Sequence, residues 1–328
     1  DVEEWHNLGG SELGTNRVLP NEDIGSVAYQ LQEKKIDGLI VIGGFEAYQS
    51  VKQLKDASKT YPIFNMPIVC LPSTVSNNVP GTEYSLGVDT CLNVLVNYCD
   101  AVKHSASSSR RRVFVIEVQG GNCGYIASYI GVVTGALAVY TPEHNISLKT
   151  IEEDLELLEK TFANDHGDER SGRIFIRNEK ASDVYTTQLI ADIIMENAHG
   201  KYESRTAIPG HVQQGKIPSS FDRTSAVRFA IKACEFIEEK HAAISKKISE
   251  YNSEHLILPN TSENSNGEEA IDGKFKHFEN KDFFNTEKRL LYVYHHGKRI
   301  LVADDNNAVV CGIQGTNVAF RDINDVWE

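Results

Sequence analysis

Residues 67–87 read PIVCLPSTVSNNVPGTEYSLG, and this stretch decides the interpretation of the rest of the chain. Its first five residues form a short apolar run of the kind that becomes a buried strand. Residues 72–87 then bring small hydroxyls, two adjacent amides and a Pro-Gly turn, and a helical pattern begins near Val88. In open α/β sheets, ligands bind outside the carboxyl ends of the strands. The stretch therefore predicts an α/β fold with a binding loop at residues 72–87.

Composition limits the classes of ligand that this chain can bind. Its 328 residues are 41% hydrophobic and 24% charged, which is a globular balance, and the formal net charge is −13. Such a charge argues against binding to nucleic acid or to an anionic membrane surface. No apolar run approaches 18 residues, and the first ten residues, DVEEWHNLGG, lack a leader pattern. We expect a cytoplasmic protein whose partners are small molecules or other proteins.

Cysteine and histidine spacing gives no support for a metal site. The six cysteines form no CxxC pair and lie mostly inside apolar patterns, as buried free thiols of a reducing compartment do. The one adjacent histidine pair, His295 and His296, precedes a glycine in an expected hairpin turn. We therefore expect no metal in this chain.

Strand and helix patterns alternate along most of the chain, which predicts an α/β fold with doubly wound, mostly parallel sheets. Asn21 is the expected cap of the first helix, and no strand precedes it, so the chain is expected to start inside a domain. We expect helices at 21–35, 46–58, 88–103, 122–140, from 147, 182–197 and 222–248. We expect strands at 38–44, 67–71, 113–118, 174–176, from 204, 290–294, 299–303 and 308–312. A polar connection at 105–112 and a polar surface insertion at 260–287 complete the assignment.

Three domains are expected from this order of elements. Residues 1–130 are expected to form the remainder of a larger α/β subdomain, and residues 131–250 a smaller subdomain with a long connecting helix. Residues 251–328 contain the insertion and terminal strands that pack back on the fold.

Polar residues gather where the predicted strands end. The segments are Arg17, 73–78, 119–121, 177–180 and 205–214, and the exits of parallel strands are expected to converge on one face. Guanidinium groups, glycine amides and helix N-termini together favour phosphate, so the predicted ligand is a small hydroxylated phosphate ester. Alternatives stay open for single residues. Arg17, Arg205 and the arginines at 110–112 also fit a solvated surface, and His211 also fits a structural role.

Five motifs in order give the chain a specific resemblance. They are GGFEA at 43–47, STVSNNVPGT at 73–82, VQGGNCG at 118–124, RNEK at 177–180, and PGHVQQ at 209–214 followed by FDR at 221–223. With these motifs the chain resembles the C-terminal half of the duplicated subunit of eukaryotic, fungal-type ATP-dependent 6-phosphofructokinases. The resemblance implies a phosphofructokinase-like fold, truncated here at both ends, in an enzyme of glycolysis.

The catalytic residues of that family are replaced in this chain. Phe45 stands where a carboxylate would hold magnesium-ATP, Ser76 and Asn78 replace two aspartates, and Gly121 replaces an arginine. Phosphoryl transfer needs a metal-held nucleotide, a base and charge stabilisation. The resemblance therefore implies that this half has no catalytic residue, and that magnesium and ATP bind in the catalytic half of the parent subunit.

The resemblance also implies that this half binds the activator fructose 2,6-bisphosphate. Arg112 would reach the 6-phosphate from across a subunit boundary, with Arg205 and His211 from the resident chain, while Arg17 and Gln214 would bind the second phosphate. Glu179 and the turn at 119–121 would hold sugar hydroxyls. The implied effector-binding residues are Arg17, Thr74, Val75, Ser76, Asn77, Asn78, Arg112, Gln119, Gly120, Gly121, Glu179, Arg205, His211, Val212, Gln213 and Gln214.

Implied partners are the N-terminal catalytic half of the same subunit and homologous subunits, as a hetero-octamer if the protein is fungal. Two other functions stay open. This half is either an active sugar-phosphate kinase that uses Glu46 for the metal and Glu83 as the base, or a structural duplicate that stabilises the oligomer. Lys216 either contacts phosphate or points to solvent.

Overall fold

A computed structural model describes residues 2, 4–108, 111–165, 172–254, 292–295, 298–301 and 307–326. The insertion expected at 260–287 and Arg110 lie outside these residues. The described chain divides into two compact units. The first unit comprises Asp1–Thr15, Ser73–Asn78 and Tyr84–Ala226, and the second comprises Asn16–Pro72, Val79–Glu83 and Val227–Glu328.

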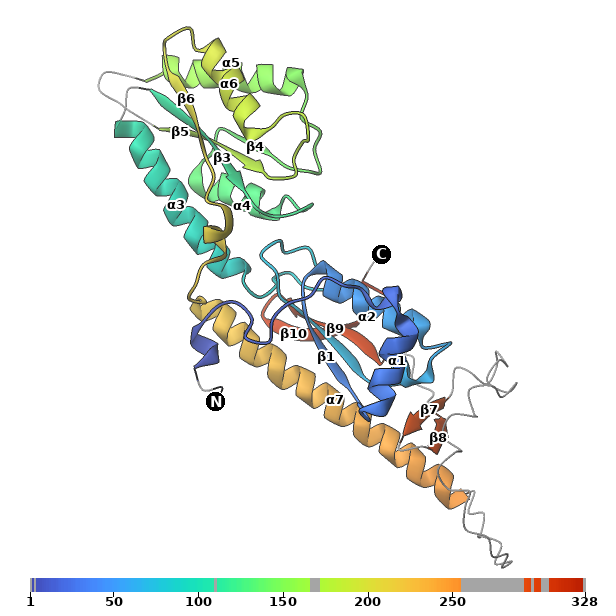
Figure 1. Cartoon of the computed structure of the whole chain (residues 1–328). Helices are drawn as coiled ribbons and strands as arrows, with labels where there is room; N and C mark the ends of the chain where they lie inside the picture. Colours follow the sequence, from blue (N-terminus) through green and yellow to red (C-terminus); the bar gives the residue numbers. More distant parts are fainter. Residues whose placement is uncertain are drawn as a thin grey trace, which may run out of the picture. The chain divides into compact units, whose positions relative to one another are not determined.

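The first unit is built on a sheet of four parallel strands in the order β4 (Ala138–Tyr140), β5 (Arg173–Asn178), β3 (Arg112–Val118) and β6 (Glu203–Ala207). Helices α3 (Val88–Ser108) and α4 (Tyr125–Thr134) cover one face, and α5 (Leu148–Ala163) and α6 (Thr187–Asn197) cover the other (Figure 1). Along β3, Val115 packs with α5 and α6, whereas Ile116 packs with α3 and α4. Successive side chains of a strand point to opposite faces, so a sheet covered on both sides takes a continuous apolar run.

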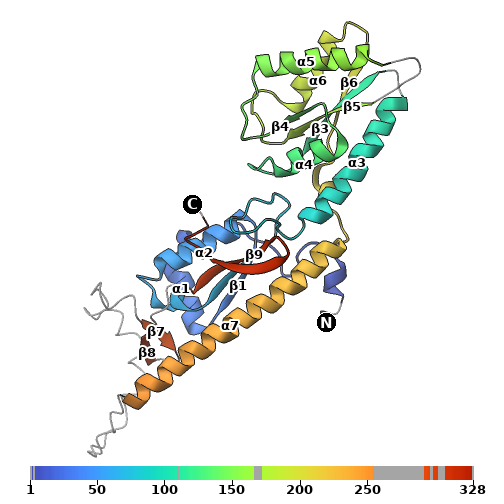
Figure 2. The ribbon, with the colours of Figure 1, turned by 180° about the vertical axis from the view of Figure 1, so that it is seen from behind.

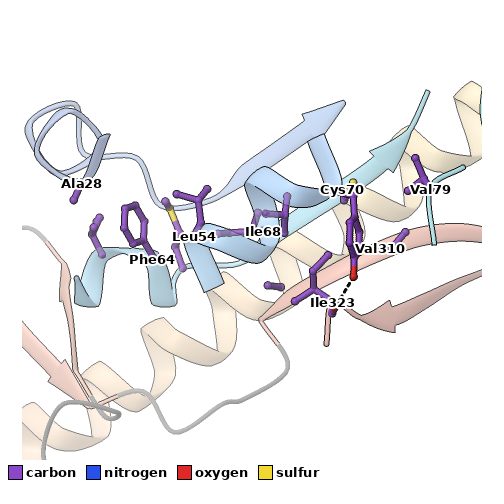
Figure 3. Packing of buried hydrophobic residues seen from close by; sticks show 13 residues of the cluster. Ala28, Leu54, Phe64, Ile68, Cys70, Val79, Val310 and Ile323 are labelled. Carbon is purple, nitrogen blue, oxygen red and sulfur yellow. Dashed lines mark hydrogen bonds between the residues drawn. The ribbon is translucent and has the colours of Figure 1, made fainter. Parts of the chain in front are cut away.

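The second unit contains a sheet in the order β1 (Leu39–Gly43), β2 (Ile68–Pro72), β9 (Ala308–Gln314) and β10 (Asn317–Asp322), in which only the β9–β10 pair is antiparallel among the described strands. Helices α1 (Ile24–Glu33) and α2 (Phe45–Ala57) lie on one side, and the part of α7 (Ser220–Glu254) from residue 227 lies on the other (Figure 2). Phe64, Ile68 and Val310 pack in its core, where the Tyr48 hydroxyl donates to the Ile323 carbonyl at 3.2 Å (Figure 3).

Short elements complete the description. They are the 3-10 helices η1 (Trp5–Asn7), η2 (Pro20–Glu22), η3 (Pro62–Asn65) and η4 (Gly210–Gln214), and an antiparallel pair of strands, β7 (Tyr292–His295) and β8 (Lys298–Leu301). No helix within the described ranges is long and apolar enough to cross a membrane.

The predicted fold class is confirmed, and several element boundaries are corrected. The first helix begins at Ile24, because Asp23 rather than Asn21 is its cap and accepts from the Ser26 amide at 3.0 Å. The helix expected at 122–140 ends at Thr134, because Gly135 adopts a left-handed conformation with φ of 62°, and β4 follows. The connection expected at 105–112 is helical to Ser108.

Two further expectations differ from the structure. Strand β1 is not fully buried: Leu39 and Val41 pack against the core, while Ile40 and Ile42 on its other face are 41% and 62% exposed. The expected domain boundary at residue 130 falls inside α4, which packs on β5 and stays in the first unit, so the structure divides the chain at other positions.

Most cysteines are buried free thiols, as the sequence predicts. Cys234 is exposed and Cys123 is intermediate. Burial raises the pKa of the other four thiols, those of Cys70, Cys91, Cys99 and Cys311, to about 12.

Candidate functional site

The loop at Ser73–Asn78 is shaped by its own polar side chains. Asn77 adopts a left-handed conformation with φ of 52°, and its Oδ1 accepts from the Ser85 amide at 2.8 Å and from the Ser85 hydroxyl at 3.0 Å. The Thr74 hydroxyl accepts from the Ser76 amide at 3.2 Å. Thr74 and Asn77 therefore hold the loop in shape, whereas Asn78 Oδ1 is buried and has no hydrogen-bond partner among the described residues.

The second segment of the site is the turn of Gln119, Gly120 and Gly121, directly after β3 ends. Oε1 of Glu179 accepts from the amides of Gly120 and Gly121 at 3.3 and 3.0 Å. Gly121 has φ of 57°, and a Cβ placed there would lie 3.5 Å from the Ser76 hydroxyl oxygen. The loop and the turn are therefore neighbours in the first unit, as the sequence predicts.

The end of β5 supports the same turn from the other side. The Asn178 amide is fully buried and donates to the Cys123 carbonyl at 2.9 Å. A Cβ on Gly120 would lie 2.7 Å from Asn178 Nδ2, so only glycine fits between these groups. Neighbouring Arg177 pairs with Glu117 at 3.1 Å and is 2% exposed, which identifies it as a structural residue rather than one facing a ligand.

The short helix η4 presents His211 and Gln214 at the surface. Both side chains are exposed, and Gln214 Nε2 lies 3.2 Å from His211 Nδ1. Val212 is 72% exposed, whereas Gln213 is fully buried and bonds to the backbone of Gln119. His211 and Gln214 are thus accessible at the surface, and Gln213 faces inward.

Arg205 does not lie where the sequence analysis places it, whereas Arg112 lies at the start of its strand, as the expected connection at 105–112 and strand at 113–118 imply. Arg112 is the first residue of β3, and Arg205 lies beside Phe114 in the register of β6. At about 3.3 Å per residue, five to seven residues of parallel strand put these positions roughly 16–23 Å along the sheet from Gln119. The expectation that all five segments converge on one face is therefore wrong, and Arg205 does not join His211.

Arg112 and Arg205 instead share an acidic partner at the amino end of the sheet. Glu203 Oε2 lies 3.2 Å from Nη2 of Arg112 and 3.6 Å from Nη2 of Arg205. The Arg205 side chain is 58% exposed, and Nε of Arg112 is buried without a hydrogen-bond partner in the described chain. Two guanidinium groups and one carboxylate leave a local positive charge at this end.

Four predicted residues remain to be placed, namely Arg17, Glu46, Glu83 and Lys216. Arg17 is exposed and belongs to the second unit. Glu46 is exposed, and Glu83 Oε2 accepts from the Gly315 amide at 3.0 Å. The Lys216 side chain is exposed, and its carbonyl accepts from the Gly9 amide at 2.7 Å.

Sequence reasoning missed Asp222 as a residue that positions the site. Its buried carboxylate accepts from the amides of Gly87 and Thr90, both at 2.9 Å, and from the Thr90 hydroxyl. These amides belong to the start of α3, whose positive dipole end favours a carboxylate. The signal in the sequence is the FDR motif at 221–223, in which an acidic residue follows an aromatic residue at the start of a helix.

The first unit therefore offers hydroxyls, amides, a histidine and backbone N–H groups on a parallel α/β sheet. Glu179 and Asp222 are each bonded to backbone amides, and no group of three or more metal-ligating side chains occurs in the described residues. Hydroxyl, amide and backbone N–H groups can form hydrogen bonds with a polar, hydroxylated ligand. The fold and these residues define an α/β protein whose polar side chains and backbone N–H groups gather at the carboxyl ends of parallel strands, the edge at which such sheets bind ligands.

Comparison with known proteins then gives the family. A family model described as Phosphofructokinase matches residues 1–237, and the chain belongs to the phosphofructokinase family. Over its whole length it is 54% identical to the ATP-dependent 6-phosphofructokinase subunit alpha of Komagataella phaffii, of which it covers 30%. It is 55% identical over 74% of its length to subunit beta of the same yeast, of which it covers 26%.

A solved structure supports the same assignment. The phosphofructokinase of Saccharomyces cerevisiae superposes with a TM-score of 0.77 at 48% identity, covering 99% of this chain and 36% of that chain. The resemblance seen in the motifs is thus confirmed, and the chain spans about a third of its relatives.

Proposed function

We propose that this chain is the regulatory part of a fungal ATP-dependent 6-phosphofructokinase subunit, and that it binds fructose 2,6-bisphosphate without catalysing phosphoryl transfer. The observation that carries the proposal is that two uncharged residues, Ser76 and Gly121, lie beside each other in the first unit. In the family, acids and an arginine occupy the corresponding motif positions.

Electrostatics explains why this exchange favours a bisphosphate. A carboxylate about 4 Å from a second phosphate would repel it by roughly 4 kcal/mol per unit charge at an effective dielectric near 20. Ser76 and Asn78 remove that repulsion and keep hydrogen-bonding groups. The buried, unpartnered Oδ1 of Asn78 is an acceptor that suits a sugar hydroxyl better than a phosphate.

We assign Arg112 and Arg205 to a different ligand from the one that Ser76 and Gly121 bind. Because Arg112 and Arg205 lie roughly 16–23 Å along the sheet from Gln119, we assign both of them to the phosphate of a ligand held by a neighbouring chain. A forked guanidinium matches phosphate oxygens. In the absence of a phosphate, the shared Glu203 pairs with both side chains and holds them in place. Each site then needs two chains.

Magnesium-ATP does not fit the second unit of this chain. Phe45 begins α2, and its ring packs 5.9 Å from the ring of Tyr48, where the family has a metal-binding carboxylate. Glu83 is engaged by a backbone amide, so the alternative of a kinase using Glu46 and Glu83 gains no support. We assign magnesium and ATP to the other half of the parent subunit.

The parent enzyme would act as a cytoplasmic hetero-oligomer of alpha and beta subunits, since relatives of both names match this chain. Binding of the bisphosphate would favour the active arrangement of subunits. Thermodynamic linkage then requires fructose 6-phosphate at the catalytic half to tighten effector binding by the same factor.

Isothermal titration of the assembled full-length enzyme with fructose 2,6-bisphosphate tests the proposal. Arg112→Ala and Arg205→Ala are each expected to weaken binding at least tenfold, because each removes a charged phosphate contact. Arg228→Ala is the matched control, since Arg228 donates to the Thr316 carbonyl of its own unit and should leave affinity unchanged. Undiminished affinity in both variants would overturn the assignment of the arginines to the phosphate, and no binding by the wild type would favour a structural duplicate instead.

A further inference from the structure

We propose that Gln213 is a positioning residue that locks the ligand-facing turn of Gln119, Gly120 and Gly121 to the helix η4 that carries His211. This inference rests on the proposed function, because it concerns the same binding site. Gln213 would act through the turn without touching the ligand.

The geometry is a two-point clamp on one residue. Oε1 of Gln213 accepts from the Gln119 amide at 2.8 Å, and Nε2 of Gln213 donates to the Gln119 carbonyl at 3.1 Å. The same Nε2 lies 3.5 Å from Sγ of Cys91 on α3, and Gln213 has 0% exposure. A single side-chain amide thus satisfies both backbone groups of Gln119.

This clamp replaces pairing that the sheet no longer supplies. The register of β3 with β5 ends at Val118, and that with β6 ends at Ile116. Buried peptide groups beyond the ladder need other partners. Gln213 fills this need at the first residue after the strand, where a leucine or methionine would leave a donor and an acceptor unpaired.

The clamp belongs to a set that fixes the whole turn. Glu179 bonds to the amides of Gly120 and Gly121, and Asn178 bonds to the Cys123 carbonyl. Gln213 differs from these two because it comes from η4, between the exposed His211 and Gln214. It therefore sets the separation between the turn's N–H groups and the side chains at the other edge of the site.

Only glutamine meets this demand at position 213. Asparagine has the same amide but is one methylene shorter, so it keeps at most one of the two bonds. Methionine has a similar length and neither hydrogen-bonding group. A residue needed merely to fill the core would favour the apolar side chain, since Cys91 beside it belongs to an apolar cluster.

The test uses the assembled full-length enzyme with Gln213→Met and Gln213→Asn. Gln188→Met is the matched control, because the exposed Gln188 in the same unit donates from its side chain to Asp192 one helical turn away, on the surface of α6. Titration with fructose 2,6-bisphosphate gives the dissociation constant, hydrogen exchange of the peptide covering 119–123 reports the turn, and thermal unfolding reports stability. We expect the dissociation constant to be at least tenfold larger for Gln213→Met, three- to tenfold larger for Gln213→Asn, and unchanged for Gln188→Met.

The exchange measurement separates this inference from the proposed function. Faster exchange at 119–121 in the Gln213 variants, with a melting temperature close to that of the wild type, supports the clamp even if the wild type fails to bind the bisphosphate. Unchanged exchange, or binding by Gln213→Met within twofold of the wild type, overturns it. If Gln213→Met does not assemble, the same two criteria apply to Gln213→Asn.

Discussion

Replacing Arg177 by methionine should loosen the sheet that supports the site. Arg177 is 2% exposed, and its guanidinium pairs with Glu117 at 3.1 Å. It also donates to the carbonyls of Ser182 at 2.6 Å and Tyr185 at 3.0 Å, in the segment that leads into α6. Methionine preserves most of the apolar stem and removes every donor.

The magnitude follows from the burial of the pair. Removing one partner of a buried ion pair costs about 3–5 kcal/mol, because the other charge stays behind in a poor solvent. The Glu117 side chain is 26% exposed and accepts a hydrogen bond from the Thr187 hydroxyl. We therefore expect a loss of stability at the lower end of that range, about 3 kcal/mol. Adding Glu117→Gln removes the stranded charge and should restore about 1–2 kcal/mol.

Native-state hydrogen exchange of the full-length subunit measures the local loss of stability, from the opening free energies of peptides in β5 and α6. The single variant should lower both, and the double variant should recover part of the loss. A single-variant change below about 1 kcal/mol, or a double variant no better than the single one, would refute the reasoning about a stranded charge.

Three further predictions concern the turn, α3 and the thiols. Gly121→Ala should weaken binding of fructose 2,6-bisphosphate about tenfold, as measured by titration. Gly135 has a similar φ and open space around it, so Gly135→Ala should only lower the free energy of unfolding, by the backbone strain of about 1–3 kcal/mol. Asp222→Asn should lower the opening free energy that hydrogen exchange measures at the start of α3 by about 2 kcal/mol, and Asp89→Asn on the same turn should lower it less. Equal losses would contradict the capping role of Asp222. The four buried thiols, with a pKa raised by burial to about 12 against 9.0 when unfolded, lose protons first in the unfolded chain. The free energy of unfolding should therefore fall above pH 9, by about 1.4 kcal/mol per thiol at pH 10 in urea titrations, and a flat profile would rule this out.

The sequence predicted that the segments at 73–78 and 119–121 lie together because their local chemistry is explicit. Small hydroxyls and amides after an apolar run, and paired glycines after the next one, mark strand exits wherever the sheet lies. Their meeting at Ser76 and Gly121 follows from that pattern. The fold class follows in the same way from the alternation of strand and helix patterns.

The sequence did not predict where Arg205 lies or what Gln213 does. Arg205 lies within β6 beside Phe114, and a run of polar residues gives no measure of which end of a sheet it occupies. Gln213 is polar between two exposed neighbours, so nothing local indicates that it is fully buried. Both properties depend on contacts distant in the chain, with Phe114 and Gln119 respectively.

The end of α4 shows the same limit at the level of secondary structure. Residues 122–140 are small and apolar throughout, so periodicity alone continues the helix. The left-handed Gly135 ends it and leaves room for β4 to pair with β5.

A crystal structure of the full-length enzyme grown with both fructose 2,6-bisphosphate and magnesium-ATP tests the central claim most directly. We predict that the bisphosphate lies beside Ser76 and Gly121, with one phosphate near His211 and Gln214 and the other bound by arginines of a neighbouring chain, and that no nucleotide lies beside Phe45. Magnesium-ATP bound beside Phe45, or an empty cluster at saturating bisphosphate, would contradict it.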